Sequence, residues 1–169
     1  ACCDVIIATK DSTIAMGGPA MIEGGGLGIY TPEEVGPMSF QVPNGVVDIL
    51  VEDEAEAVQV AKQYLSYFQG STDSWEAPDQ RKLRHIVPEN RLRLYDMREI
   101  IATLADKDSV LEIRAGFGVG VITCFIRVEG RPMGVIANNP HHLAGAIDSD
   151  AADKGLSLIH ISEPTRLTS

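Results

Sequence analysis

The stretch GRPMGVIANNPHHLAGAIDSDAADK, residues 130–154, decides how this chain folds. It opens with a Gly-Arg-Pro turn and continues into the apolar run 133–137, which we interpret as a buried strand. The polar residues 138–146 predict a loop, and the acidic residues within 148–153 predict the start of a helix. A strand that leads through small residues to a helix N-terminus points backbone N–H groups at one place, as binding of an anion or oxyanion requires.

The residues just before this stretch predict a helix followed by a hairpin. Asp96 is a typical N-cap for a helix over 97–104. The apolar face of this helix would hold Met97, Ile100, Ile101 and Leu104. Two β-rich runs, 110–113 and 120–128, predict strands, and Glu129-Gly130 predicts the turn into the strand at 133–137.

The first half of the chain shows the same mixture of short strands and helices. Strands are predicted at 4–9, 13–16 and 46–51. A helix is expected to begin at Pro19 and end at the glycines 24–26, and a second short one to begin at Thr31-Pro32. Asp53 is the predicted cap of the strongest helix, whose apolar face would hold Val58, Ala61, Leu65 and Phe68.

Composition sets broad limits on the function. The 169 residues are 44% apolar and carry a formal net charge of −10, so the chain would repel the phosphates of nucleic acid. No apolar run approaches the length of a membrane span, and we expect neither a membrane nor a nucleic-acid partner. Cys2, Cys3 and Cys124 lack metal-site or disulfide spacing, which favours reduced thiols in a cytoplasmic protein.

Four segments together resemble one protein family. They are IAMGGPAMIEGGGLGIYTPEEVGP (14–37), NGVVDILVEDEAEAVQVAKQYLSYF (44–68), VPENRLRLYDMREIIATLADKDSVLEI (87–113) and the opening stretch 130–154. In this order they resemble the carboxyltransferase component of biotin-dependent acyl-CoA carboxylases, over about residues 1–154. The resemblance implies an α/β, crotonase-like fold of ββα units, with the back of one domain and the start of a second.

The resemblance also implies a domain division. Residues 1–69 would be the C-terminal part of the first crotonase-like domain, 70–94 a linker, and 95–154 the start of the second domain. Both ends of the chain look cut, because it starts without Met in a core strand. The string LSLIHISEPTRL resembles the translated read-through of a sequencing adapter and contains Pro164, so we expect residues 155–169 to lie outside the fold.

The family resemblance implies the transfer of a carboxyl group from carboxybiotin to the α-carbon of an acyl-CoA, such as acetyl- or propionyl-CoA. Biotin on a carrier domain would be the cofactor, with no metal in this segment. The implied partners are acyl-CoA, biotin carboxyl carrier and biotin carboxylase domains or subunits, and further copies of the full protein. We expect the parent to be an enzyme and the isolated chain to be inactive. Two alternatives stay open: a structural or interaction fragment, and a biotin-dependent acyl-CoA decarboxylase subunit.

The candidate binding residues are small or amide-bearing. Gly17 and Gly18 precede a helix and would line an acyl or CoA pocket, or simply form a tight turn. Asn138 and Asn139 would hydrogen-bond a ureido or thioester carbonyl, or else satisfy backbone groups in their own turn. Ala144 and Gly145 are the sharpest candidates, because small residues let a ligand approach the backbone.

No catalytic side chain is expected within the sequence. His141-His142 would flank the loop rather than bind a metal, since adjacent side chains diverge and no third ligand is spaced to join them. The acidic residues at 148–153 are interpreted as helix-start residues and not as general bases.

Overall fold

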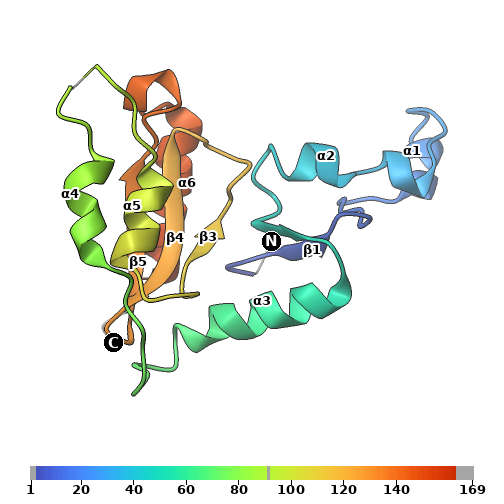
Figure 1. Cartoon of the computed structure of the whole chain (residues 1–169). Helices are drawn as coiled ribbons and strands as arrows, with labels where there is room; N and C mark the ends of the chain where they lie inside the picture. The colour runs from blue at the N-terminus through green and yellow to red at the C-terminus, as the bar shows by residue number, and fades with distance from the viewer. Residues whose placement is uncertain (1–2, 91, 163–169) are drawn as a thin grey trace, which may run out of the picture.

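Two small β-sheets organise the chain in a computed structural model that describes residues 3–90 and 92–162. Strands β1 (Ile7–Thr9) and β2 (Ile49–Val51) pair in parallel. Strands β3 (Leu111–Ile113), β4 (Val121–Val128) and β5 (Arg131–Asn138) form an antiparallel sheet in the order β3-β4-β5. Figure 1 shows the larger sheet on one side of the molecule and β1 on the other, above α3.

Short helices connect and cover these strands. They are α1 (Pro19–Gly24), α2 (Met38–Gln41), α3 (Glu54–Ser66), α4 (Leu83–Ile86), α5 (Met97–Leu104) and α6 (Ser149–Ser162). Single 3₁₀ turns lie at Pro32–Glu34, Gln80–Lys82 and Leu143–Gly145. The predicted caps are confirmed: Asp53 accepts a bond from the N–H of Glu56 at 2.8 Å, and Asp96 accepts one from Arg98 at 2.8 Å.

The predicted hairpin is also confirmed. Val128 pairs with Arg131, and the two residues between them, Glu129 and Gly130, have φ angles of 52° and 77°. Positive φ at both central residues gives the twist that a two-residue hairpin needs. A Cβ at Gly130 would overlap the carbonyl oxygen of Thr72, so glycine is required here for space as well as for conformation.

The larger sheet carries a helix on each face. Neighbouring residues of a strand point to opposite faces, so Cys124 and Phe125 of β4 belong to two different cores. Cys124 packs in a cluster with Ile101 of α5, whereas Phe125 packs in a cluster with Leu158 of α6. The second cluster also contains Tyr67, which follows α3, and therefore joins the two halves of the chain.

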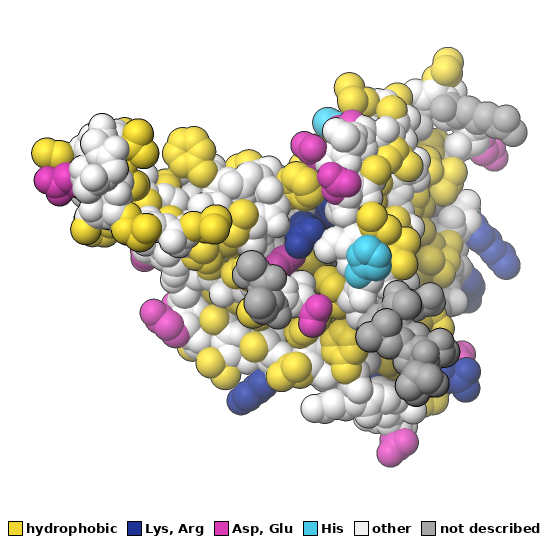
Figure 2. Space-filling view, turned by 180° about the vertical axis from the view of Figure 1, so that it is seen from behind, with side chains coloured by type: hydrophobic (Ala, Val, Ile, Leu, Met, Phe, Trp, Pro, Cys, Tyr) yellow, Lys and Arg dark blue, Asp and Glu magenta, His cyan; other side chains and the backbone are white. Residues whose placement is uncertain are grey.

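A long arm, residues 10–46, contains α1 and α2 and carries α1 away from both sheets (Figure 1). At its base Met38 packs with Ala8 and Val47 in a third small cluster. Farther out, the large apolar side chains Met16 and Ile29 are 106% and 83% exposed. The space-filling view shows apolar side chains over this protruding part of the molecule (Figure 2).

Three sequence predictions about burial and length are wrong. The strand at 133–137 is not buried, because β5 lies at the sheet edge and Met133 is 46% exposed. The predicted face of α3 is largely exposed, since the helix packs instead through Val60 and Tyr64, on its other side. The stretch 13–16 forms only a single bridge, from Thr13 to Pro37.

The prediction that residues from 155 onward lie outside the fold is wrong up to Ser162. Helix α6 continues past Gly155, and both Gly155 and Leu158 are buried. Packing against the sheet outweighs the cost of about 1 kcal/mol that glycine carries inside a helix. Residues 163–169, including Pro164, lie outside the described residues, and so does Cys2. Within the described ranges, no helix has the length and apolar character to cross a membrane.

Candidate functional site

The loop that joins β5 to α6, residues 138–148, is anchored by Asn139. Its backbone N–H donates to the carbonyl of Gly120 at 2.8 Å, and its side-chain Nδ2 donates to the carbonyl of Val119 at 2.9 Å. Its Oδ1 accepts from the N–H of His141 at 3.1 Å. Asn139 is buried and uses its amide to fix the loop, which is the second of the two roles that the sequence left open.

A run of three left-handed residues follows in the loop. Leu143, Ala144 and Gly145 have φ angles of 45°, 53° and 88°. A non-glycine residue pays roughly 1–2 kcal/mol in this region, so the run stores strain. Hydrogen bonds from the N–H of Gly145 to His142 at 2.8 Å and from that of Ala146 to Leu143 at 3.1 Å hold it. Backbone strain of this kind is concentrated at binding and catalytic sites.

The start of α6 closes the loop. Asp148 accepts a bond from the N–H of Ala151 at 2.9 Å and faces Nε2 of His142 at 3.2 Å. The backbone bond from Ala151, followed by the bond to His142, holds the pKa of Asp148 below its usual value. Asp148 is thus a capping residue, as the sequence predicts, and it ties the loop histidine to the helix.

Glycines of the turn at 116–120 pack directly against this helix start. A Cβ on Gly118, whose φ is 51°, would lie 2.6 Å from the carbonyl oxygen of Asp150. A Cβ on Gly120 would lie 3.1 Å from the carbonyl oxygen of Ala146. These two residues are not among the predicted site residues, although the alternating glycines of GFGVG are a signal of close backbone approach.

The loop therefore presents backbone groups and small side chains, with few ionisable ones. Ala144 and Asn138 are exposed and Gly145 is half-buried, so a ligand can reach them. A Cβ on Gly145 would lie 2.9 Å from Nδ2 of Asn138, which brings these two predicted residues side by side. The N–H groups of Gly145 and Ala146 are bonded within the loop, so the exposed amide of Asn138 is the donor that suits the polarisation of a carbonyl or oxyanion. Within the described residues no cluster of three potential metal ligands occurs.

The other two predicted binding residues are elsewhere. Gly17 and Gly18 precede α1 in the arm, and the carbonyl of Gly18 accepts from the N–H of Met21 at 3.0 Å. Figure 1 places α1 at the far end of the arm, well away from α6. The chain thus brings together Asn138, Asn139, Ala144 and Gly145 but not the two glycines of the arm.

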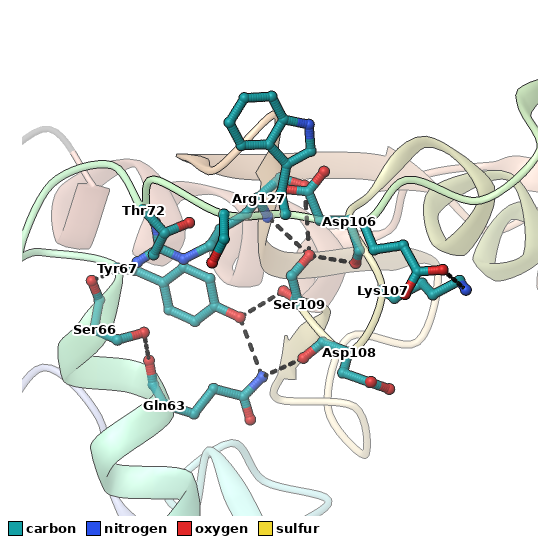
Figure 3. Close-up of a pocket in the computed structure, with 12 residues that line it drawn as sticks. Gln63, Ser66, Tyr67, Thr72, Asp106, Lys107, Asp108, Ser109 and Arg127 are labelled. Atoms are coloured by element: carbon teal, nitrogen blue, oxygen red, sulfur yellow. Dashed lines mark hydrogen bonds and ion pairs between the residues drawn. The ribbon is translucent and has the colours of Figure 1, made fainter.

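A second hollow lies between α3 and the sheet, and Arg127 lines it together with Tyr67 and Ser109 (Figure 3). The guanidinium donates to three carbonyls: Ser66 at 2.7 Å, Gly70 at 3.0 Å and Gly130 at 2.6 Å. The same group lies 5.4 Å from the centre of the Tyr67 ring. Every carbonyl bound belongs to the protein itself, so Arg127 is committed to holding the segment after α3 against the hairpin.

Tyr67 and Asp106 complete this network. The Tyr67 hydroxyl donates to the carbonyl of Ser109 at 2.5 Å, and burial raises the pKa of Tyr67. Asp106 accepts from the N–H groups of Glu129 at 3.0 Å and Gly130 at 2.7 Å. All these groups have internal partners, so we assign the hollow a structural role at the junction between the two halves of the chain.

Comparison with known proteins identifies the fold and the family. The carboxyl transferase domain family matches residues 1–167. The chain is 30% identical over 174 residues to the biotin-dependent long chain acyl-coenzyme A carboxylase beta4 subunit of Mycobacterium tuberculosis, covering 95% of this chain and 33% of that protein. It is 29% identical over 177 residues to the methylmalonyl-CoA decarboxylase subunit alpha of Veillonella parvula, covering 95% and 34%.

A solved structure agrees more closely. The chain superimposes on a single-chain, multi-domain long-chain acyl-CoA carboxylase with a TM-score of 0.93 and 59% identity, covering 95% of this chain and 16% of that one. This chain therefore has the crotonase-like α/β fold of carboxyltransferases. The chain belongs to the carboxyl transferase domain family of biotin-dependent acyl-CoA carboxylases. It spans about a third of the length of the curated relatives it matches.

Proposed function

We propose that the parent of this chain is a carboxyltransferase that moves a carboxyl group from carboxybiotin to the α-carbon of an acyl-CoA. The observation that carries the proposal is the match to a long-chain acyl-CoA carboxylase at 59% identity over nearly the whole chain. Biotin, when bound on its carrier, supplies the carboxyl group. Biotin carrier and biotin carboxylase domains or subunits, and further copies of the protein, are the proposed partners.

The role proposed for this chain is to shape one wall of the reaction site with the loop 138–148. Ala144 and Gly145 leave the loop backbone open to a thioester or ureido carbonyl, and Asn139 fixes that backbone to the turn beneath it. Asn138, exposed beside Gly145, is proposed to donate to such a carbonyl. Gly17 and Gly18 are proposed to contact the acyl-CoA from the arm, outside this loop.

The test is a chimera in a complete enzyme. Residues 1–154 replace the matching segment of the long-chain acyl-CoA carboxylase whose structure this chain resembles, and biotin-dependent carboxylation is assayed with acetyl-, propionyl- and palmitoyl-CoA. We expect the chimera to be active and the isolated chain to be inactive. A folded, assembled chimera without carboxylation would contradict the proposal.

A decarboxylase subunit is the second candidate, favoured by the similarity to the Veillonella protein. The same chimera distinguishes the two activities when it is supplied with methylmalonyl-CoA and free biotin carrier. Transfer of the carboxyl group from methylmalonyl-CoA to the biotin carrier, without carboxylation of any acyl-CoA, would favour decarboxylation. Turnover by the isolated chain would show that the groups needed for chemistry lie within residues 1–169.

A further inference from the structure

Helix α6 packs on the sheet through a stripe that contains a lysine. The buried positions of the helix are Ala151, Lys154, Gly155 and Leu158, which follow the i, i+3, i+4, i+7 spacing of a core-facing surface. Three of them are small or apolar, as this surface requires. Lys154 is only 1% exposed and is the largest fully buried side chain among the described residues.

The amine of Lys154 is buried without a partner. Its Nζ has no hydrogen-bond acceptor within the residues that the structure describes. An ammonium carries three donors, and leaving them unpaired in an apolar core is strongly unfavourable. The side chain of a helical residue extends back over the preceding turn, so this amine lies under the N-terminal half of α6. Burial, as the largest cause, lowers the pKa of Lys154 to about 8.

The charged groups around Lys154 are already occupied. Glu112 of β3 raises its pKa, but both oxygens of Glu112 accept bonds from Arg98 of α5, at 2.8 and 2.7 Å. Arg98 and Arg114 lower it, and Arg114 is itself paired with Asp48 at 2.5 Å.

Other titratable groups that the structure describes near α6 do not hydrogen-bond to the amine. Cys124 of β4 keeps its proton, because burial raises the pKa of this thiol to about 12. Asp150 and Asp153 of α6 itself are exposed, and Arg131, the charged residue of β5, is exposed at the first position of that strand. Among the described residues, the acid whose charge acts on the amine is thus Glu112, and its carboxylate is shared with Arg98.

We propose that Lys154 makes the packing of α6 on the sheet a proton-dependent switch. With a neutral amine the helix is docked; when the amine takes up a proton, α6 releases from the sheet so that Nζ reaches water. The alternative, a charged and unpaired ammonium in the core, is the state that release relieves.

The release would reach the candidate loop through Asp148. This residue joins the first turn of α6 to His142, and the turn at Gly118 and Gly120 packs against the same helix start. A helix that leaves the sheet therefore removes the support on which the strained residues 143–145 depend. The switch belongs to the fold of this chain and does not rest on the proposed enzymatic function.

Methyl NMR of the full 169-residue chain tests this switch, because methyl signals remain visible at alkaline pH. Leu158 shares its core with the ring of Phe125, so its methyl shifts report docking of α6. Ile122 lies in the core on the other face of the sheet and reports global unfolding. The pKa of Lys154 falls from 10.5 to about 8 on docking. The ratio of released to docked helix should therefore be roughly tenfold lower at pH 9 than at pH 7.

Two substitutions bracket the effect. K154M keeps the apolar stem without charge, so the Leu158 methyls should show the docked position at both pH values. K154R keeps the charge, and the helix should stay released at both. K62M, which removes an exposed lysine of α3, should retain the wild-type pH dependence. Where K154R gives no spectrum, the comparison of wild type with K154M decides.

The proposal is overturned if the Leu158 methyls of the wild type do not change between pH 7 and 9. It is equally overturned if K154M changes as the wild type does. A parallel change at Ile122 would mean that the whole chain unfolds, which also contradicts a local release.

Discussion

Two substitutions with opposite expected effects on stability test the positive φ angles of Ala144 and Gly145 in the candidate loop. G145A adds a Cβ at a φ of 88°, 2.9 Å from Nδ2 of Asn138. We expect it to lower the free energy of unfolding by about 1–2 kcal/mol. A144G removes a Cβ at a φ of 53° and should raise it by roughly 0.5–1 kcal/mol. Urea unfolding followed by circular dichroism measures both changes. G24A in α1 is the control, because a Cβ at this position would have no neighbour within 4 Å.

Arg127 is the second residue whose role is open to direct test. R127K keeps the charge but loses the planar fork that reaches the carbonyls of Ser66, Gly70 and Gly130. We expect a loss of about 1–3 kcal/mol in the free energy of unfolding. The exposed pair of Arg81 with Asp79 supplies the control, and R81K should leave the free energy of unfolding almost unchanged. Equal effects of the two substitutions would argue against the junction role.

At the scale of elements, the N-cap of α6 links helix and loop. D148A removes the acceptor for the N–H of Ala151 and the partner of His142, so it should lower thermal stability. D148N keeps a capping oxygen and should lower it less. The pKa of Asp148 is lower in the folded state than its unfolded value of 3.8. Its contribution to stability is therefore present above pH 3.8 and is lost as the pH falls through the folded pKa. Thermal melts of both variants at pH 7 and pH 3 check this, and a D148A that melts like the wild type at pH 7 would refute the cap.

Local signals predicted the elements well and their surroundings poorly. The caps Asp53 and Asp96 and the turn at Gly130 are encoded within a few residues, and all three are confirmed. The exposure of Met133 was not predicted, because an apolar run does not distinguish a central strand from an edge strand. The continuation of α6 past Gly155 was missed because tertiary packing, not propensity, supports that turn.

The candidate site was predictable only in part, for the same reason. Ala144 and Gly145 were recognisable as small residues in a loop before a helix, whereas the positive φ of Leu143 leaves no trace in the sequence. The part played by Lys154 was also hidden, since a lysine at the start of a helix normally faces solvent. Its burial follows from the rotation of α6 on the sheet, which no local pattern specifies.

The pH dependence of stability is a property of the whole molecule. The folded pKa of Lys154 is lowered to about 8, so between that value and 10.5 the unfolded chain binds more protons and stability rises with pH. The gain should approach about 3 kcal/mol. Tyr64 and Tyr67 have raised folded pKa values, so their contribution is lost at pH above their usual value of 10.0. Urea unfolding from pH 7 to 11 should therefore show a maximum between pH 9 and 10.5, and K154M should remove the rise.

The two sheets are held together by Asp48, a buried residue just before β2. Its carboxylate accepts from the N–H of Ile6 at 2.7 Å and from Nε of Arg114 at 2.5 Å, and its carbonyl accepts from the N–H of Arg114 at 2.8 Å. The predicted domain boundary at residue 69 falls between these partners, which are 66 positions apart in the sequence. This junction and the shared core around Tyr67 and Phe125 make the two halves one packed unit.

Removal of one partner should expose how strongly the halves depend on this junction. D48A leaves Arg114, a largely buried cation, unpaired, and we expect a loss of about 3 kcal/mol in the free energy of unfolding. D79A, which breaks an exposed pair, should have a much smaller effect than D48A. Limited proteolysis adds the spatial readout, because a loosened junction should speed cleavage between the halves, at Arg81 and Lys82 in the segment 70–94. If D48A and D79A unfold at the same urea concentration and are cleaved at the same rate, the sheets are held by the apolar core alone.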